Sequence, residues 1–262
     1  MMEVLKCHQR IIREKLEITE SNNLFGRYWE NIDLSKDNAV VKEITRKEAL
    51  PLILKYGWLG TLPVHFTKFV GLYFDNYLVG ATCFHNNKIA GKYSLFSYPA
   101  WCLGRGACVH FAPNWAGSFL VSSACKLLFN KSHPVFVVAY SDYDAGEIGT
   151  IYQACNWTFL GKIKAQVWRD KNGKDCSITP HTRAVTGFAR RKNPKLKATK
   201  EQIKVEVDKL IKDGYTKVKK ERGKYAYAYG LKCKKKRIMQ KILKENQKPY
   251  LKRNGSNKSN KK

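Results

Sequence analysis

The chain of 262 residues is long enough for one substantial domain with an extension, because domains usually span about 100 to 200 residues. Its 44% hydrophobic and 12% aromatic residues exclude a wholly disordered chain, and no stretch approaches the roughly 18 apolar residues of a membrane-spanning helix. The formal net charge of +28 makes a polyanion such as nucleic acid the leading partner.

The basic charge is concentrated near the C-terminus. Residues 1–189 carry 22 basic and 15 acidic side chains, whereas residues 190–262 carry 27 and 6, a net charge of +21. Such a field attracts polyanions and gains free energy from counterion release. A basic tail that only keeps the protein soluble is the alternative. Binding to a membrane surface ranks lower, because the tail lacks the broad apolar face of an interfacial helix.

The eight cysteines form no Cys-x-x-Cys pair. The first 15 residues, MMEVLKCHQRIIREK, contain no apolar core followed by a small-residue cleavage site. We therefore expect reduced thiols, a cytoplasmic protein and no structural zinc.

The first half of the chain predicts two helices and a β-hairpin. Apolar residues near helical spacing predict a helix over 4–18. The capping box Thr45-Arg-Lys-Glu48 starts a second helix, which Gly57 should end. Within 70–84, strand-like runs flank Asp75-Asn76, whose side chains tolerate the left-handed dihedrals of a tight turn.

The middle of the chain alternates strands and helices. In order, the pattern predicts a strand over 106–111, a helix over 117–131, a buried strand over 134–140, a helix through Ile151 and Tyr152, and strands over 157–169 and 181–190. Together with the hairpin, this order predicts an α/β domain with a mixed sheet.

After residue 189 the composition becomes lysine-rich. We expect an amphipathic helix over 199–212, a strand over 225–230 and no ordered structure from 232 onward, where apolar residues are few and isolated. The predicted parts are an N-terminal helical lead-in over 1–44, a catalytic domain over 45–189, a basic α/β extension over 190–231 and a disordered, lysine-rich tail over 232–262.

The segment between the strand over 106–111 and the helix over 117–131 has the order of an anion-binding loop. A helix start presents free backbone N–H groups, which suit a pyrophosphate. The candidate cofactor-binding residues here are Asn114, Ala116, Gly117 and Ser118. Ser118 is equally well suited to capping its own helix.

About 30 residues later, the chain reads Ile151-Tyr152-Gln153-Ala154-Cys155-Asn156-Trp157. With the loop, this resembles the GNAT acetyltransferases, whose later helix carries a pattern like LYxxxGF. Asn156 replaces the glycine, since Asn also adopts the left-handed region at a helix C-terminus, and Trp157 should pack under the helix.

The GNAT resemblance implies a mixed central β-sheet flanked by helices, and acetyl-CoA or a related acyl-CoA as group donor. It also implies that the Tyr152 hydroxyl protonates the thiolate leaving group. The loop keeps one glycine where the family has more, so another mode of binding or another donor stays open. A core-packing role for Tyr152 is the alternative.

A closer resemblance is carried by Leu103-Gly104-Arg105, Ser118, Tyr140-Ser141-Asp142 and the hexamer Gly149-Thr-Ile-Tyr-Gln-Ala154. Read together, these residues are similar to the Mom family of bacteriophage DNA-modification proteins, a divergent branch of the acetyltransferase fold. That family converts adenine in DNA to N6-methylcarbamoyladenine, which protects phage DNA from restriction. The resemblance implies double-stranded DNA as partner and the bacterial host cytoplasm as location. A requirement for iron and the oligomeric state stay open.

The chain departs from the Mom pattern at three places. The family often has a His-Tyr pair where Gly57-Trp58 stands, an acidic residue where His110 stands and a histidine where Glu147 stands. His65 lies near the first departure and is a substitute candidate, although a lone histidine is more often structural.

The predicted catalytic residues are Tyr152, Asp142, Arg105 and Ser118. Asp142 follows a buried strand, where α/β sheets place ligands, and is the candidate for deprotonating or positioning the adenine amine. Arg105 can hold a phosphate of cofactor or DNA through its planar guanidinium group. The alternatives are a turn-capping role for Asp142 and a surface ion pair for Arg105.

An adenine inside a duplex has to be flipped out, and Trp58, Trp101 and Trp115 are available to stack on it, although core packing is the more common role for any one of them. Two other functions remain open: an N-acetyltransferase acting on a protein or small-molecule amine, and a non-catalytic protein that binds nucleic acid.

Overall fold

The structure is a computed structural model that describes residues 7–21, 28–60, 62, 66–86, 100–131, 136–142, 145–174, 193, 200–231 and 236–252. The chain divides into two compact units. The first comprises Met1–Ser141, Gly146–Gly161 and Tyr225–Lys262, and the second comprises Asp142–Ala145 and Lys162–Lys224.

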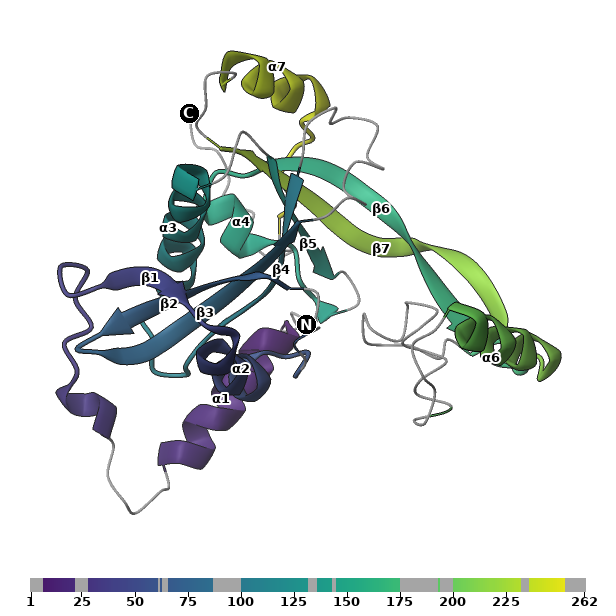
Figure 1. Cartoon of the computed structure of the whole chain (residues 1–262), viewed down its shortest axis with the longest axis horizontal. Coiled ribbons are helices and arrows are strands. Elements are labelled where there is room, and N and C mark those ends of the chain that lie inside the picture. Colours follow the sequence, from purple (N-terminus) through teal and green to yellow (C-terminus); the bar gives the residue numbers. More distant parts are fainter. Residues whose placement is uncertain are drawn as a thin grey trace, which may run out of the picture. The chain divides into compact units, whose positions relative to one another are not determined.

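Helices and strands are interspersed along the chain (Figure 1). They are α1 (His8–Ser21), the 3-10 helix η1 (Tyr28–Asn31), β1 (Val40–Ile44), α2 (Arg46–Tyr56), β2 (Lys68–Phe74), β3 (Tyr77–Asn86), β4 (Ala100–Cys108), α3 (Ala116–Lys131), β5 (Phe136–Asp142), α4 (Thr150–Ala154), β6 (Thr158–Arg169), α6 (Lys200–Lys212), β7 (Thr216–Gly230) and α7 (Lys236–Asn246).

The strands form one mixed sheet in the order β1-β2-β3-β4-β5-β7-β6. β1 to β4 pair antiparallel, and β4 pairs parallel with β5. This architecture confirms the predicted α/β class and its GNAT-like mixed sheet flanked by helices. The predicted strand over 181–190, and with it the predicted boundary at 189, lie outside the described residues.

Several local predictions are confirmed. Asp75 and Asn76 both have positive φ, 46° and 67°, and join β2 to β3 as a tight hairpin. The capping box at the start of α2 is formed, because the backbone N–H of Glu48 donates to the Thr45 hydroxyl and the Glu48 carboxylate accepts from the Thr45 N–H. Gly57 ends that helix.

Two predictions need correction because the structure places strands differently. The segment expected as a helical lead-in also contains β1, which pairs with β2 from Val40↔Tyr73 to Ile44↔Phe69. Its five residues are too few and too exposed to show an alternating pattern. The strand expected over 106–111 instead spans Ala100–Cys108, because the chain turns after Cys108 toward α3.

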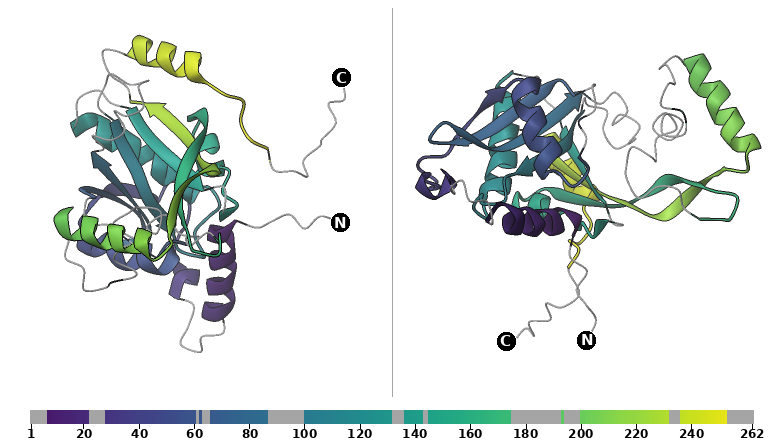
Figure 2. Two further views of the ribbon diagram at one scale, coloured as in Figure 1. Left: turned by 90° about the vertical axis from the view of Figure 1, so that its right-hand side faces the viewer. Right: turned by 90° about the horizontal axis from the view of Figure 1, so that it is seen from below.

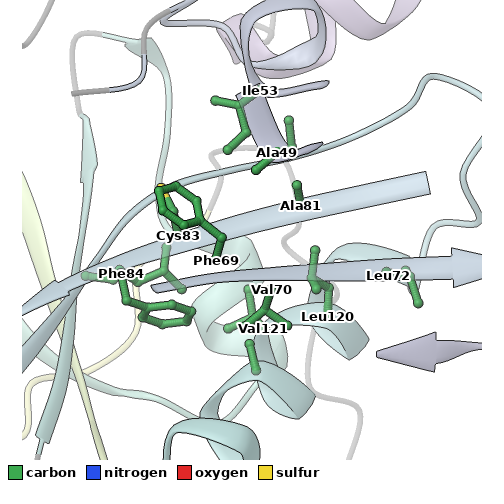
Figure 3. Close-up of a cluster of buried hydrophobic side chains, with 14 of the residues drawn as sticks. Ala49, Ile53, Phe69, Val70, Leu72, Ala81, Cys83, Phe84, Leu120 and Val121 are labelled. Carbon is green, nitrogen blue, oxygen red and sulfur yellow. The ribbon is translucent and has the colours of Figure 1, made fainter. Parts of the chain in front are cut away.

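Helices α2 and α3 cover opposite faces of the sheet (Figure 3). Successive side chains of a strand point to opposite faces, so each strand supplies both cores. Figure 3 shows Phe69, Ala81 and Cys83 toward Ala49 and Ile53 of α2, and Val70 and Leu72 toward Leu120 and Val121 of α3.

Helix α7 covers a smaller core formed by β4, β5 and β7. Met239 and Leu243, 1% and 9% exposed, pack there. Their partners are Ala100, Cys102, Phe136, Val138 and Ala228. Figure 2 shows α1 and α7 at opposite ends of the first unit.

The prediction of a disordered tail is therefore wrong for 236–252. The apolar residues of this segment are few, but Ile238, Met239, Ile242 and Leu243 recur at helical spacing and form one apolar side. Residues 253–262 lie outside the described residues.

The segment after α7, residues 247–252, continues along the edge strand β6 and is called the C-terminal strap below. The backbone N–H of Lys248 donates to the carbonyl of Phe159 (2.8 Å). The Tyr250 hydroxyl donates to the carbonyl of Trp157 (2.7 Å). Leu251 then packs against the main core. The strap thus covers backbone groups of an edge strand that would otherwise be open to pairing with another chain.

The second unit contains the outer parts of β6 and β7 with helix α6, which confirms the predicted amphipathic helix. Trp168 and Leu210 are buried in it, and Gly214, with φ +86°, follows the helix end. Among the described residues of both units, no helix is both long and apolar enough to cross a membrane.

We expect Met239→Ala to lower the free energy of unfolding by about 2 to 5 kcal/mol, since it leaves a cavity under α7. Ile238→Ala is the matched control, because Ile238 is 49% exposed on the same helix, and it should change stability by less than about 0.5 kcal/mol. Urea denaturation measures both. Equal, small losses would show that α7 is not anchored in solution.

Candidate active site

Strands β4 and β5 pair over only part of their length. Among the described residues, their register runs from Ala100↔Phe136 to Leu103↔Ala139. β4 then continues to Cys108, paired on its other side with β3. Beyond Leu103, the backbone of β4 therefore has a partner strand on one side only.

A β-bulge lies at the point where the two strands separate. In the register of β3 with β4, Cys83 pairs with Arg105 and Phe84 pairs with Leu103, so Gly104 is the extra residue. A Cβ at Gly104 would overlap the ring of Phe66. A bulge bends its strand and redirects the next side chain, which here is Arg105. The Leu103-Gly104-Arg105 motif thus lies inside β4.

Arg105 is half-buried and its guanidinium Nη1 donates to the carbonyl of Gly104 (2.6 Å). Burial lowers the pKa of Arg105, and charges on Cys83, Cys102 and Tyr152 offset part of that effect. The group stays a cation at neutral pH, because an arginine ordinarily titrates above about 12. Arg105 also interacts electrostatically with Tyr152.

Helix α4 ends in a Schellman motif, which explains why an asparagine follows it. Asn156 has φ +57°. The Trp157 N–H donates to the Tyr152 carbonyl (2.9 Å), and the Asn156 N–H donates to the Gln153 carbonyl (3.0 Å). The rings of Tyr152 and Trp157 lie 5.2 Å apart, the apolar contact that usually accompanies this motif. The sequence-based interpretation of Asn156 and Trp157 is therefore confirmed.

Tyr152 is 9% exposed and is packed between Trp157 and Tyr227, with ring centroids 5.2 Å from each. Burial raises the pKa of its hydroxyl well above the usual value, and the negative charge of Glu147 raises this pKa further. The phenol therefore keeps its proton across the neutral range. In this form it can donate a hydrogen bond or a proton to a strong base.

Tyr227 of β7 holds the hexamer that contains Tyr152. Its hydroxyl donates to the carbonyl of Ile148 (2.5 Å). The side-chain amide of Gln153 donates to the Tyr227 hydroxyl (3.2 Å), and it also reaches the carbonyl of Leu251 in the C-terminal strap (3.3 Å). Gly149 has φ +74°, and a Cβ there would overlap the Tyr227 ring. Two residues of the hexamer, Gly149 and Gln153, thus help to fix the position of Tyr152.

The start of α3 lies beside α4. The Ser118 hydroxyl donates to the carbonyl of Trp115 (2.9 Å), so it stabilises the first turn of its own helix. A Cβ at Gly117 would lie 3.0 Å from Cδ1 of Ile151. The thiol of Cys155 donates to the carbonyl of Ser118 (3.3 Å). This glycine therefore lets α4 approach α3 closely.

The other loop residues differ in accessibility. Asn114 is exposed, whereas Ala116 is fully buried and offers a ligand no side-chain surface. The Ala116 N–H is already bonded to the Pro113 carbonyl (2.9 Å). The backbone N–H groups of Gly117 and Ser118 follow in the first helical turn, where an anion is favoured.

Asp142 is the last residue of β5 and is 5% exposed. It belongs to the second unit, whereas Arg105, Ser118 and Tyr152 belong to the first. The structure thus brings Ser118 next to the helix that carries Tyr152. The roles of Arg105 and Asp142 stay predictions.

Sequence reasoning did not select Glu147 or Tyr227 as site residues. Glu147 was noted only as a departure from the family pattern, yet its charge acts directly on Tyr152. Tyr227 lies 75 residues away in the run YAYAYG, whose alternation showed a strand but not which tyrosine would face Tyr152.

The three tryptophans suggested for base stacking are occupied by protein contacts. Trp58 packs edge-on against His8, and Trp115 packs against Phe74 and Phe119. Trp101 is half-buried against the main core. Their packing role is therefore visible, and a stacking role stays a prediction.

His110 follows β4 and is 3% exposed among Trp29, Tyr56 and Phe111. Burial lowers its pKa, which favours the neutral ring, and neither ring nitrogen has a hydrogen-bond partner among the described residues. His65 lies outside the described residues. Within the described ranges, no group of three or more His, Cys, Asp or Glu side chains can hold a metal ion.

Comparison with known proteins identifies a family. A model of the Mom protein family matches residues 38–252. No match was found among curated proteins.

Solved structures with a similar arrangement include acetyltransferases. One is a Bacillus subtilis acetyltransferase in complex with CoA, at 10% identity and a TM-score of 0.38, covering 74% of this chain and 99% of that chain. A GNAT acetyltransferase of Elizabethkingia anophelis with acetyl-CoA bound has 10% identity and a TM-score of 0.38, covering 75% and 100%. The AtaT-AtaR complex bound to DNA has 17% identity and a TM-score of 0.32, covering 47% and 87%.

Gly149→Ala should destabilise the protein more than Gly173→Ala. Both glycines have left-handed backbone, with φ +74° and +76°, so each alanine costs about 1 to 2 kcal/mol in strain. The space around Gly173 is open, whereas alanine at Gly149 meets the Tyr227 ring and adds about 1 to 3 kcal/mol of overpacking. Urea denaturation compares the two variants. Losses of equal size would contradict the close contact with Tyr227.

The raised pKa of Tyr152 gives stability a dependence on alkaline pH. A pKa raised by folding stabilises the protein below the unfolded value, about 10, and this contribution is lost as the pH rises above it. Between about pH 9 and about pH 11, the wild type should therefore lose more unfolding free energy than Tyr152→Phe. Parallel losses in the two proteins would show that Tyr152 is not buried in its neutral form.

Proposed function

This chain belongs to the Mom protein family, and from that premise we propose that it is an acyltransferase-type enzyme that modifies the N6 amine of adenine in double-stranded DNA. The product proposed is N6-methylcarbamoyladenine, which protects DNA from restriction. The observation that carries the proposal is the buried, protonated Tyr152, held between Trp157 and Tyr227 and next to the start of α3.

The chemistry demands both a proton acceptor and a proton donor. The lone pair of adenine N6 is delocalised into the ring, so its attack on a donor needs orientation and stabilisation of developing charge. When the new bond forms, N6 loses one proton. When the old bond breaks, the leaving group takes the electron pair and needs a proton.

Tyr152 is suited to supply the second proton. Its hydroxyl is protonated at neutral pH, because burial and Glu147 both disfavour the phenolate. Its position is fixed by the Schellman motif and by Tyr227. A positioned acid of this kind contributes about 10² to 10⁴-fold to a rate.

Two carboxylates are candidates for accepting the N6 proton. Asp142 is the residue that the sequence predicts, at the end of β5. Glu147 is favoured by its electrostatic coupling to Tyr152. Separate substitutions distinguish them, since only the acceptor's amide variant should lose activity while the other retains it.

The proposed donor is an acyl-CoA, which would supply an activated acyl carbon and a thiolate leaving group. Acetyl-CoA itself would leave an acetyl group on N6, so the methylcarbamoyl product requires a related acyl-CoA that already carries the methylcarbamoyl group. The groups that would bind the phosphates of this donor are the backbone N–H groups of Gly117 and Ser118 and the guanidinium group of Arg105. Asn114 is exposed at the same loop, whereas Ala116 contributes only backbone. The Ser118 hydroxyl is engaged within the first turn of α3, which favours a supporting role for it. No step is assigned to iron.

The proposal is tested by mass spectrometry of nucleosides from the DNA of cells that express this chain. We expect a heavier deoxyadenosine whose mass identifies the added group. The variants Tyr152→Phe, Asp142→Asn and Glu147→Gln are compared at equal soluble expression, and Tyr152→Phe should abolish the new nucleoside.

Unmodified DNA from well-expressed wild type would contradict the proposal. If the protein then acetylated a peptide or a polyamine with acetyl-CoA, this would favour an N-acetyltransferase that acts on a protein or small-molecule amine. A cellular phenotype that survives Tyr152→Phe and Asp142→Asn would favour a protein that only binds nucleic acid.

A further inference from the structure

The basic residues of helix α7 lie along one line. Arg237, Lys241 and Lys244 follow one another at intervals of four and three residues, the spacing of neighbours on one helix face. All three side chains are exposed. These residues are called the α7 stripe below.

The opposite side of α7 fixes the direction in which this stripe points. Met239 and Leu243 are buried against β4, β5 and β7, and Ile242 packs beside them. The C-terminal strap holds the other end, through the bond from the Lys248 N–H to the Phe159 carbonyl. The charges of the stripe therefore stand on an anchored helix, and little conformational entropy of the backbone is lost when they bind a partner.

The charge of this region is almost entirely positive. Lys248 and Lys252 follow the helix and are exposed. Glu245 pairs with Lys241 at 4.0 Å, but the side chains are 59% and 79% exposed, so this pair adds little. The stripe thus matches a ligand with several negative charges.

The exposed side of α7 offers little apolar surface to a lipid bilayer. Ile238 is 49% exposed, whereas Met239 and Leu243 are already covered by the protein. An interfacial helix needs its apolar face free to enter the headgroup region. A regular, water-exposed polyanion is the better match, and DNA presents a phosphate charge about every 1.7 Å along its axis.

We propose that the α7 stripe is a docking surface for the phosphate backbone of double-stranded DNA. This inference rests on the proposed function, which takes DNA as the substrate. It goes beyond that function by assigning the contact to one face of a folded helix, not to a flexible lysine-rich tail. Arg237, Lys241 and Lys244 each neutralise one phosphate and release its counterion.

The test is the salt dependence of binding to a fluorescent DNA duplex, measured by anisotropy with the full chain. The triple variant Arg237→Gln, Lys241→Gln, Lys244→Gln should lower the slope of log K against log salt by about 2.7, at about 0.9 per phosphate contact. Glutamine retains helix propensity and leaves the buried side intact. Circular dichroism and thermal unfolding check that the fold is unchanged.

The matched control removes three positive charges from another exposed helix, by Lys204→Gln, Lys209→Gln and Lys212→Gln in α6. This variant should lower the slope by less than about one. An equal loss in both variants would overturn the proposal, because net charge alone would then explain binding.

The outcomes distinguish a failure of the proposed DNA substrate from a failure of the proposed docking surface. Wild type that binds no DNA would contradict both the substrate and the docking surface. Wild type whose slope is unchanged by the α7 variant would overturn only the docking surface. Binding to phosphatidylserine vesicles that the α7 substitutions abolish, with DNA binding intact, would overturn it in favour of a membrane.

Discussion

The separation of β4 from β5 is the constraint on which the site depends. Paired strands satisfy the hydrogen bonds of one another's backbone groups, so the separation of two neighbouring strands needs a local structural cause. Here the cause is the bulge at Gly104, a residue that the Phe66 ring requires to be glycine. The bulge redirects Arg105 and leaves the far half of β4 paired on one side only. The start of α3 and Tyr152 are then the elements available to hold a ligand at that strand.

Tyr152 is placed by packing that extends far beyond its own helix. A five-residue helix has little stability by itself, so α4 relies on its C-terminal motif and on Tyr227. The C-terminal strap reaches the same helix through Gln153 and covers the edge of β6. Residues 247–252 therefore help to support the proposed acid, although the amino-acid composition there is that of a solvated tail.

The sequence predicted features with local causes better than features with distant ones. The capping box at Thr45 and the left-handed Asn156 each depend on neighbours within a few residues, and both were predictable. The bulge depends on Phe66, which lies 38 residues before Gly104, and no periodicity signals it. Helix α7 was missed because charge dominates its composition, while two buried side chains, Met239 and Leu243, decide its structure. Glu147 lies near Tyr152 in the sequence, yet its effect was missed, because that effect depends on the burial of Tyr152 against the distant Tyr227.

The most direct test of the site is amide hydrogen exchange of the purified protein with and without acetyl-CoA. Bound phosphates should slow exchange at the first turn of α3, residues 116–118, and at the unpaired side of β4, residues 104–108. We expect protection to be concentrated in these two segments, with exchange in α6 unchanged. Exchange that stays the same in both segments, at acetyl-CoA concentrations sufficient for any GNAT-type site, would contradict the assignment of this region as the donor site.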